Sequence, residues 1–413
     1  MVEYLRDFAR QSKLNIYYEV SVVSVERRGD GFVLRDSQGI SYGCKWLVIA
    51  TGLSQPYLPD IPGIEWAEHY ANVSTDPSGF LDQRVLIIVK GNSAFETANN
   101  LLEHAAVVHL ASRHSVTFAW DTHHIGDLRS VNNDFLDTYL LKAQNATLEA
   151  TIQRIERVDD EYEVSIKYHR ARNSTASYRY DRIIACTGFR FANKIFDDQC
   201  QPEMMIDDRL PALTSCWEST NVSNMYFAGT LMQSRDYKKT SSAFIHGFRY
   251  NIRALHRILE QRNYGRAWPS IKVTSWFPDV LSIIIRRLNG SSGMWLQYGF
   301  IGDLVIEPSD TKPGRYLEDV PVDYAHSTEL CADRPHYVVT LEYGRSDFDP
   351  LRGDRVSHTD VEHGAESTAL HPVIRRYQDE DMIDELHLVE NLEAVWCDEK
   401  LHVEPLRRFL TRE

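Results

Sequence analysis

The chain has 413 residues, 43% of them hydrophobic and 25% charged, and a formal net charge of −14. This length predicts about two to four domains, and the apolar content suffices for several cores. The acidic balance excludes nucleic acid as a partner and disfavours an anionic membrane surface, since both require a basic face. No transmembrane segment is expected, because the best apolar run, residues 280–285, ends at Arg286 and Arg287.

The first segment, residues 1–81, begins with an amphipathic pattern that predicts a helix over residues 1–14, with Tyr4, Leu5 and Phe8 on one face. This stretch carries charges and has no apolar region of the signal-peptide kind. Strands are predicted over residues 16–25, 31–35 and 46–50, the first two joined by a Gly-Asp-Gly turn at 29–31. A connector with three spaced prolines follows, and proline disfavours a helix there.

The second segment, residues 82–180, contains the strongest local signal. An apolar strand over 84–89 runs into a tight turn, a helix is predicted over 94–104, and a strand over 107–111 follows. This order is the core of a nucleotide-binding unit. The predicted cofactor-binding residues are those of the turn, where a helix N-terminus offers free N–H groups to phosphate: Gly91, Asn92, Ser93 and Ala94.

Arg113 follows the second strand of this unit, where the 2′-phosphate of NADP would lie. The alternative for Arg113 is a solvated surface charge. His123 and His124 form a doublet in a loop, and such histidines are more often structural than catalytic. No catalytic residue is assigned.

The third segment, residues 181–266, opens with a strand over 182–186 that closes in Thr187-Gly188. The strand over 46–50 closes in the same way, in Ala50-Thr51-Gly52, and a third apolar strand ends in Gly229-Thr230. Glycine at such turns lets chain and cofactor approach closely. Two Thr-Gly turns on either side of a nucleotide-binding unit form a specific arrangement.

A long helix is predicted over residues 241–261, with Thr240 or Ser241 as its cap and with Ser242 and His246 in its first turns. The N-terminus of this helix would face a negative charge such as the N1/O2 edge of a flavin, so Ser241, Ser242 and His246 are candidate cofactor-binding residues. A capped helix that only packs is the alternative.

The fourth segment, residues 267–413, is rich in Pro, Asp and His, and no fold is assigned to it. The six cysteines form no Cys-x-x-Cys pair and have no histidine at metal-ligand spacing, so buried thiols are expected and no metal site. Five Asn-x-Ser/Thr sequons, at Asn72, Asn145, Asn173, Asn221 and Asn289, favour a secretory compartment.

The order of these turns resembles the flavin monooxygenase-like branch of the two-dinucleotide-binding flavoproteins. Longer stretches, at residues 91–98, 126–129, 244–250, 371–374 and 387–409, look like the degradation-associated, FAD-dependent oxidoreductase domain-containing proteins of the endoplasmic reticulum lumen. The resemblance implies an α/β, Rossmann-like fold in which residues 82–180 are inserted into an FAD-binding domain formed by 1–81 and 181–266, followed by a C-terminal α+β region. It also implies FAD as cofactor, NADP as second nucleotide, and a luminal location. The implied partners are misfolded glycoproteins and luminal ubiquitin-ligase adaptor components.

The chain also departs from this family. The glycine-rich FAD loop and the signal peptide would precede Met1, so an incomplete FAD domain and a fragment of a longer product are expected. Because that loop supplies the pyrophosphate site, this chain is expected to bind FAD weakly and not to retain it. No retention signal is read in residues 410–413. The signature of true flavin monooxygenases is replaced by the sequence at 66–70, so monooxygenase activity is not expected. Two rival functions remain open: a monooxygenase-like enzyme that uses NADPH, and a non-enzymatic module that binds misfolded clients.

Val89 stands where the first glycine of the nucleotide loop is usual. A β-branched residue in that turn would strain the backbone and weaken nucleotide binding. The alternative is that Val89 extends the strand and the turn starts at Lys90.

Overall fold

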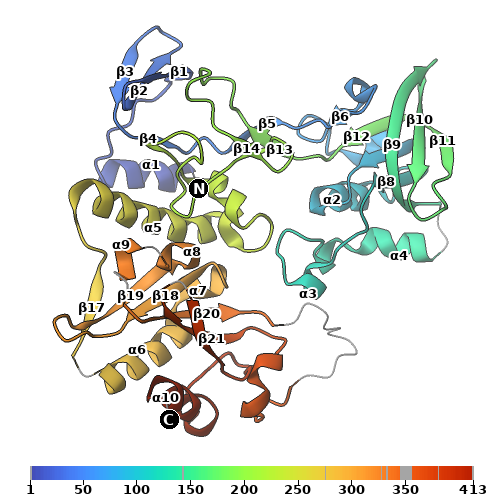
Figure 1. Cartoon of the computed structure of the whole chain (residues 1–413). Helices are drawn as coiled ribbons and strands as arrows, with labels where there is room; N and C mark the ends of the chain where they lie inside the picture. Colours follow the sequence, from blue (N-terminus) through green and yellow to red (C-terminus); the bar gives the residue numbers. More distant parts are fainter. Residues whose placement is uncertain are drawn as a thin grey trace.

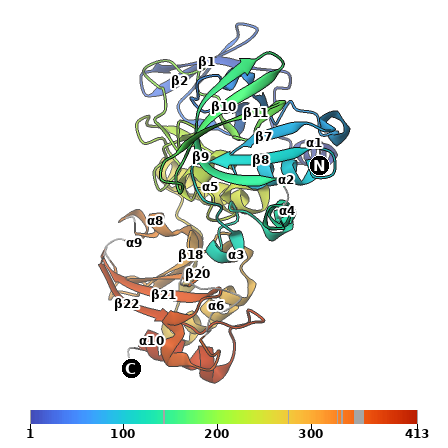
Figure 2. The same cartoon turned by 90° about the vertical axis from the view of Figure 1, so that its right-hand side faces the viewer.

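The computed structural model describes residues 2–141, 144–274, 276–326, 328–331, 334–344, 356–379 and 381–411. Arg412 and Glu413, where a retention signal was sought, lie outside the described residues. The N-terminal part of the chain forms the upper half of the molecule, and the C-terminal region packs beneath it (Figures 1 and 2).

The largest sheet has seven strands in the order β11-β10-β9-β8-β7-β12-β6. Strands β6, β12, β7, β8 and β9 run parallel, and β10 and β11 continue as an antiparallel meander. The bounds are β6 Glu68–His69, β7 Arg84–Ile88, β8 Val107–Ser112, β9 Ala146–Val158, β10 Glu161–Tyr168, β11 Thr175–Tyr180 and β12 Arg182–Ala185. Strands β6 and β12 join this sheet although both lie outside residues 82–180.

Strand β7 lies in the middle of the parallel part, and four of its five residues are buried. A continuous apolar run is typical of such a strand, because helices and further strands cover both of its faces. Helices α2 (Asn92–Leu101) and α4 (Asp134–Leu140) supply Phe95 and Phe135 to the core on one face. The predicted strand–turn–helix–strand unit is therefore confirmed, with a helix that begins two residues earlier and ends three residues earlier than expected.

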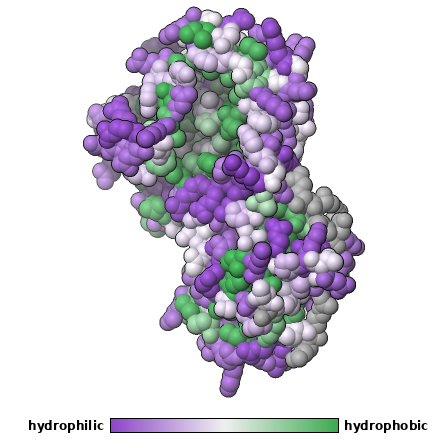
Figure 3. All heavy atoms as spheres, turned by 90° about the vertical axis from the view of Figure 1, so that its left-hand side faces the viewer, coloured by the Kyte–Doolittle hydropathy of each residue, from purple (hydrophilic) through white to green (hydrophobic). Residues whose placement is uncertain are grey.

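The N-terminal part contains α1 (Val2–Gln11), a three-stranded meander, and the parallel pair of β4 (Leu47–Ile49) and β16 (Met225–Phe227). The meander consists of β1 (Val22–Arg28), β2 (Gly31–Asp36) and β3 (Ser41–Cys44), and the turn at 29–30 joins its first two strands as predicted. No residue of α1 is buried, and Tyr4 and Phe8 are more than half exposed. The face in Figure 3 is hollowed in its upper part, with apolar residues inside the hollow.

Two chain crossings connect this part to the seven-stranded sheet. They are β5 (Leu53–Pro56) and β13 (Phe189–Phe191), which pair with each other in antiparallel orientation. The backbone N–H of Tyr57 also donates to the carbonyl of Gly188 at 2.9 Å. The crossings therefore form one short two-stranded ribbon.

The C-terminal region, to which the sequence assigned no fold, is built on a six-stranded antiparallel sheet in the order β17-β19-β18-β20-β21-β22. Helices α6 (Trp276–Gly290) and α10 (Glu404–Thr411) cover one face, and α5 (Ile245–Tyr264) packs on the other. The strands are β17 Ser270–Val273, β18 Ile301–Ile306, β19 Gly314–Pro321, β20 His336–Glu342, β21 His371–Gln378 and β22 Asp381–His387.

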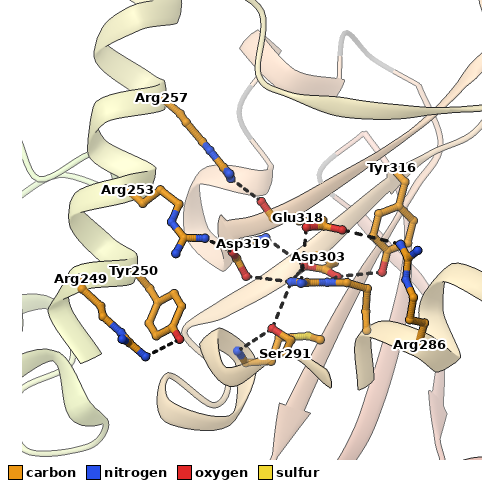
Figure 4. Close-up of polar contacts among 12 residues, drawn as sticks. Arg249, Tyr250, Arg253, Arg257, Arg286, Ser291, Asp303, Tyr316, Glu318 and Asp319 are labelled. Carbon is orange, nitrogen blue, oxygen red and sulfur yellow. Dashed lines mark hydrogen bonds and ion pairs between the residues drawn. The ribbon is translucent and has the colours of Figure 1, made fainter. Parts of the chain in front are cut away.

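A charged cluster joins this sheet to its flanking helices (Figure 4). Arg287 of α6 binds both carboxylate oxygens of Asp303, at 2.6 and 2.9 Å, and Asp319 at 2.8 Å. The hydroxyl of Tyr316 donates to Asp303 at 2.8 Å. Arg253 of α5 reaches the other oxygen of Asp319 at 3.2 Å, so the cluster extends from α6 through the sheet to α5.

The six cysteines are all free; four are buried, Cys44 is half-buried and Cys397 is exposed. Within the described ranges, no helix combines the length and apolar character needed to cross a membrane.

Candidate functional site

The predicted cofactor residues gather in two pairs of turns, each at the carboxyl ends of adjacent parallel strands. The first pair follows β4 and β16, where Ala50-Thr51-Gly52 and Gly229-Thr230 lie side by side. The N–H of Ala228 donates to the carbonyl of Ile49 at 2.8 Å and ties the two turns together. In open α/β sheets, ligands bind at this edge.

Gly52 and Gly229 both have a left-handed backbone, with φ of 66° and 72°. A Cβ added at either residue would meet no atom within 4 Å. These turns therefore leave open space beside the backbone, which fits the close approach of a flat cofactor such as a flavin. Ala50 and Thr51 are exposed next to that space.

The second pair of turns follows β7 and β12. Helix α2 starts at Gly91, which is extended, and no side chain caps the helix. A Cβ at Gly91 would also meet no atom within 4 Å. Ala94 is fully buried and lets α2 pack closely on β7. The free helix N-terminus and the open space fit a dinucleotide phosphate.

Asn92 has a structural role in addition to the predicted one. Its amide nitrogen donates to the carbonyl of Asp127 at 2.7 Å, and its oxygen accepts from Arg129 and Asn132. The side chain therefore fixes the segment that faces the loop, and only the backbone of Asn92 remains for phosphate. Residues 126–129, one of the stretches that carry the family resemblance, therefore contact the nucleotide loop.

Thr187 and Gly188 lie beside this loop, since the thiol of Cys186 contacts the carbonyl of Ser93 at 3.8 Å. Thr187 is buried, and its hydroxyl donates to the carbonyl of Tyr57. Gly188 has φ 79°, and a Cβ there would come within 2.6 Å of the Arg209 guanidinium. The positive φ favours glycine at this position, and the guanidinium of Arg209 fills the space that a side chain would take.

Tyr70 also reaches the loop. Burial raises the pKa of Tyr70, and a hydrogen bond with Ser93 acts in the opposite direction. The ring packs against His69 and Phe189, with centroids 4.8 and 5.6 Å away. Burial raises the pKa of the nearby Cys186 thiol to about 11, so this thiol is protonated at neutral pH and is a poor nucleophile.

Val89 has φ 90°, a conformation that a β-branched residue rarely adopts. This value decides between the two interpretations of the sequence: Val89 makes the turn and is strained, and it does not extend the strand. β7 ends at Ile88, one residue before it.

Arg113 directly follows β8 and is exposed. It forms no hydrogen bond or ion pair with any residue that the structure describes. Arg113 is therefore free to meet a ligand at the end of β8, although the same observation fits a solvated charge.

The start of the long helix differs from the prediction. Helix α5 begins at Ile245 after a short 3-10 turn, and no side chain caps it. The hydroxyl of the expected cap Thr240 lies instead within hydrogen-bond distance of the carboxylate of Asp236 and the side-chain oxygen of Gln297, and Ser242 accepts from Gln297 and Asn251. Both hydroxyls belong to a buried polar cluster against the C-terminal region, because Gln297 comes from beyond β17.

Of the other candidates on this helix, Ser241 is buried, and His246 is exposed and stacks on Phe244 with centroids 5.5 Å apart. His123 and His124 lie far along the chain from these turns, and His123 stacks on Tyr343 of the C-terminal region at 4.1 Å. In the part of the chain with described coordinates, no group of three or more Asp, Glu, His or Cys side chains is arranged for a metal ion.

The two pairs of turns, one on each sheet and joined by the β5–β13 ribbon, define a two-dinucleotide-binding oxidoreductase. A family model described as pyridine nucleotide-disulphide oxidoreductase matches residues 1–229. The chain belongs to this family, and membership implies a flavin cofactor.

Curated relatives extend the likeness over almost the whole chain. FAD-dependent oxidoreductase domain-containing protein 2 of Mus musculus is 34% identical to this chain over an alignment of 464 residues, gaps included. The alignment covers 99% of this chain and 69% of that protein. The protein of the same name from Danio rerio is 33% identical, over 98% of this chain and 69% of the relative. Among solved structures, a flavin-containing monooxygenase from Stenotrophomonas maltophilia has 18% identity and a TM-score of 0.47, covering 63% of this chain and 76% of its own.

Proposed function

We propose that this protein is an oxidoreductase that binds a flavin at the β4/β16 turns and a reduced nicotinamide dinucleotide at the β7/β12 turns. The observation that carries the proposal is the pairing of open turns at the carboxyl ends of two parallel strand pairs, since Gly52, Gly91 and Gly229 all face free space. When bound, the flavin supplies two-electron redox chemistry, for which a nicotinamide is the hydride donor.

The residues of the chain hold and orient the two groups. The free N-terminus of α2 binds the dinucleotide phosphates through backbone N–H groups, and Arg113 favours a 2′-phosphate because a guanidinium can donate two hydrogen bonds to it. Tyr70 and Phe189 cover the loop from the side of the chain crossings. The protonated Cys186 thiol excludes a thiolate mechanism at this position.

Flavin titration of matched glycine variants tests the flavin half of the proposal. Gly229 and Gly39 both have positive φ, of 72° and 83°, and a Cβ at either would meet no atom within 4 Å. Alanine therefore strains both backbones equally. We expect Gly229→Ala to weaken FAD binding at least tenfold, measured by quenching of flavin fluorescence, while Gly39→Ala leaves it within twofold. Equal effects of the two variants would contradict the assignment of the flavin site.

We further propose that the protein acts in the lumen of the endoplasmic reticulum, in the handling of misfolded glycoproteins with luminal ubiquitin-ligase adaptors. Two sequons support a secretory location: Asn72 and Asn173 are exposed, and their side chains make no hydrogen bond to any described residue. By contrast, the amide nitrogen of Asn289 donates to Ile285 at 2.7 Å, and that of Asn221 donates to Gln201 at 2.9 Å.

Expression with a secretory signal tests this location. We expect a mobility shift on deglycosylation that disappears in the double variant Asn72→Gln/Asn173→Gln. A monooxygenase-like enzyme would instead oxidise NADPH with turnover of a small nucleophile, and a client-binding module would capture misfolded glycoproteins without binding either cofactor.

A further inference from the structure

Lys90 occupies an unusual position between the buried strand β7 and Gly91 of the nucleotide loop. Only 8% of the residue is exposed. Its ammonium nitrogen is buried and has no hydrogen-bond partner in the described part of the chain. Lysine is almost never buried in this way unless it is paired, so the structure leaves a cation without its counter-charge.

The nearest carboxylate does not fill that role. Burial lowers the pKa of Lys90 to about 8, while Glu149 acts to raise it and Arg170 to lower it. The side chain of Glu149 already bonds the Arg170 guanidinium at 2.6 Å. Glu149 therefore offsets only part of the cost of burying Lys90, and the ammonium nitrogen has no hydrogen bond to a described residue.

The surroundings of Lys90 point to an anion from outside the chain. Glu149 lies on β9 opposite Ser112, the last residue of β8, and Arg170 donates to Ser115 at 2.8 Å. Arg113, exposed and free, lies between Ser112 and Ser115. Lys90, Arg113 and Arg170 thus lie just after the carboxyl ends of β7, β8 and β10, and the end of β8 is where this type of fold places the adenosine ribose.

A ligand has room beside Lys90, since a Cβ on the neighbouring Gly91 would meet no atom within 4 Å. The lysine stem is long and flexible, so its amine can turn to a phosphate at this edge. A ribose 2′-phosphate is the anion that this edge of the sheet receives when the dinucleotide phosphates occupy the helix N-terminus.

We propose that Lys90 is a specificity-determining residue that binds the 2′-phosphate of the adenosine ribose and, with Arg113, selects a 2′-phosphorylated dinucleotide. This inference rests on the proposed nucleotide site and adds Lys90 as a second residue that determines its specificity. The proposal predicts proton uptake on binding. The amine of Lys90 is partly deprotonated in the free chain, and it takes up a proton when a phosphate binds, because the anion raises its pKa.

Calorimetry with two nucleotide fragments tests the inference without any turnover. The probes are adenosine 2′,5′-bisphosphate and adenosine 5′-monophosphate, which differ only in the 2′-phosphate. We expect Lys90→Met to lower the affinity for the bisphosphate at least tenfold and to change that for the monophosphate less than twofold. Lys167→Met, at an exposed position on the same sheet, should change neither.

Repeating the titrations at pH 8 in two buffers with different ionisation enthalpies measures proton uptake. We expect uptake on bisphosphate binding to the parent chain, and none for Lys90→Met or for Lys90→Arg, which keeps the charge but does not titrate. Thermal melting confirms that the variants fold.

The outcomes separate this inference from the function on which it rests. If both probes bind and Lys90→Met keeps the preference for the bisphosphate, the role of Lys90 is refuted and the nucleotide site stands. If neither probe nor NADPH binds the parent chain, the nucleotide site and the role of Lys90 both fall.

Discussion

Two nearly buried cations of this chain have opposite surroundings. Arg287, in the C-terminal region, is bonded to Asp303 and Asp319, and the hydrogen bond to Asp303 holds its pKa above the ordinary value although burial alone would lower it. Lys90, at the nucleotide loop, has no partner, and burial lowers its pKa. A buried charge with a partner holds elements of the fold together. A buried charge without a partner destabilises the free protein, and a ligand of opposite charge can offset that destabilisation.

The paired side of this comparison should give the largest effect. Arg287→Met leaves Asp303 buried with no counter-charge, so we expect a loss of about 3–5 kcal/mol in the free energy of unfolding, measured with urea. The control is its neighbour Arg286. Its side chain is 65% exposed, and its ion pair with Glu318 is long, at 4.0 Å. Arg286→Met should change stability by less than about 0.5 kcal/mol. A similar loss in both variants would show that the cluster does not hold these elements together.

At Lys90, which has no hydrogen-bond partner among the described residues, removal of the charge should stabilise the folded chain. The pKa of Lys90 is about 8 in the folded chain against 10.5 when unfolded. The unfolded state therefore binds more protons between these values, and stability rises with pH across that window. Lys90→Met should raise the free energy of unfolding by about 3 kcal/mol at pH 7.

The pH dependence of that gain checks its cause. The difference between Lys90→Met and the parent chain should shrink from pH 8 to 10.5 and vanish above that value, where the amine is neutral in both states. A gain that is the same at both ends of the range would indicate improved packing and not removal of an uncompensated charge.

Backbone strain next to Lys90 gives a smaller effect. Val89 has φ 90° in the free chain, so the relief of strain contributes to stability directly. Relief is worth about 1–3 kcal/mol, and the added freedom of unfolded glycine costs about 0.5–1 kcal/mol. We expect Val89→Gly to stabilise the chain by about 1 kcal/mol in urea unfolding. Val89→Ala keeps a Cβ and should gain nothing; equal gains would refute the strain.

The smallest effect should come from the contact between the nucleotide loop region and the C-terminal region. The hydroxyl of Tyr298 donates to the carbonyls of His123 and Lys239, at 2.6 and 2.5 Å. Tyr298→Phe should cost about 1 kcal/mol and speed hydrogen exchange in residues 119–126.

Lowering the pH should weaken the contact between residues 119–126 and the C-terminal region, which includes the stack of His123 on Tyr343. Burial lowers the pKa of His123, so its neutral form is favoured in the stacked state. The contribution of this residue is complete above the unfolded value of about 6.5 and is lost as the pH falls through the folded value. Protection factors in residues 119–126, which correct for the slower intrinsic exchange of amides in acid, should therefore fall below pH 6.5. They should fall less in Tyr343→Ala, where the stack is already absent.

The sequence predicted the parts of the fold that depend on local signals. The turn at Gly91 and the two Thr-Gly turns follow apolar strands, and in the structure each of these strands, β4, β7 and β12, belongs to a parallel pair. The length of α5 was nearly correct, but its start was not, because Gln297 takes the hydroxyls expected to cap it and lies 57 residues from Thr240. Contacts at that separation leave no periodic signal.

The role of Lys90 was missed for a different reason. A lysine at the end of an apolar strand, directly before a loop glycine, is visible in the sequence, but burial and the engagement of Glu149 by Arg170 are needed to show that it is unpaired. Arg209 was likewise missed, since its approach to Gly188 depends on the packing of β13. The sheet of residues 267–413 stayed unassigned because its first strand, β17, pairs with β19 across helices α6 and α7 and strand β18, a long-range contact that local patterns do not show.

The pairing of β5 with β13 has a mechanical consequence. Both begin just after a Thr-Gly turn, β5 after Gly52 and β13 after Gly188, and they are hydrogen-bonded from Pro56 to Leu53. A rotation of the seven-stranded sheet relative to the β4/β16 pair would therefore twist β5 and β13 together, because the two strands are hydrogen-bonded to each other. The two cofactor turns at the ends of the β5–β13 ribbon then keep their separation while their relative angle changes.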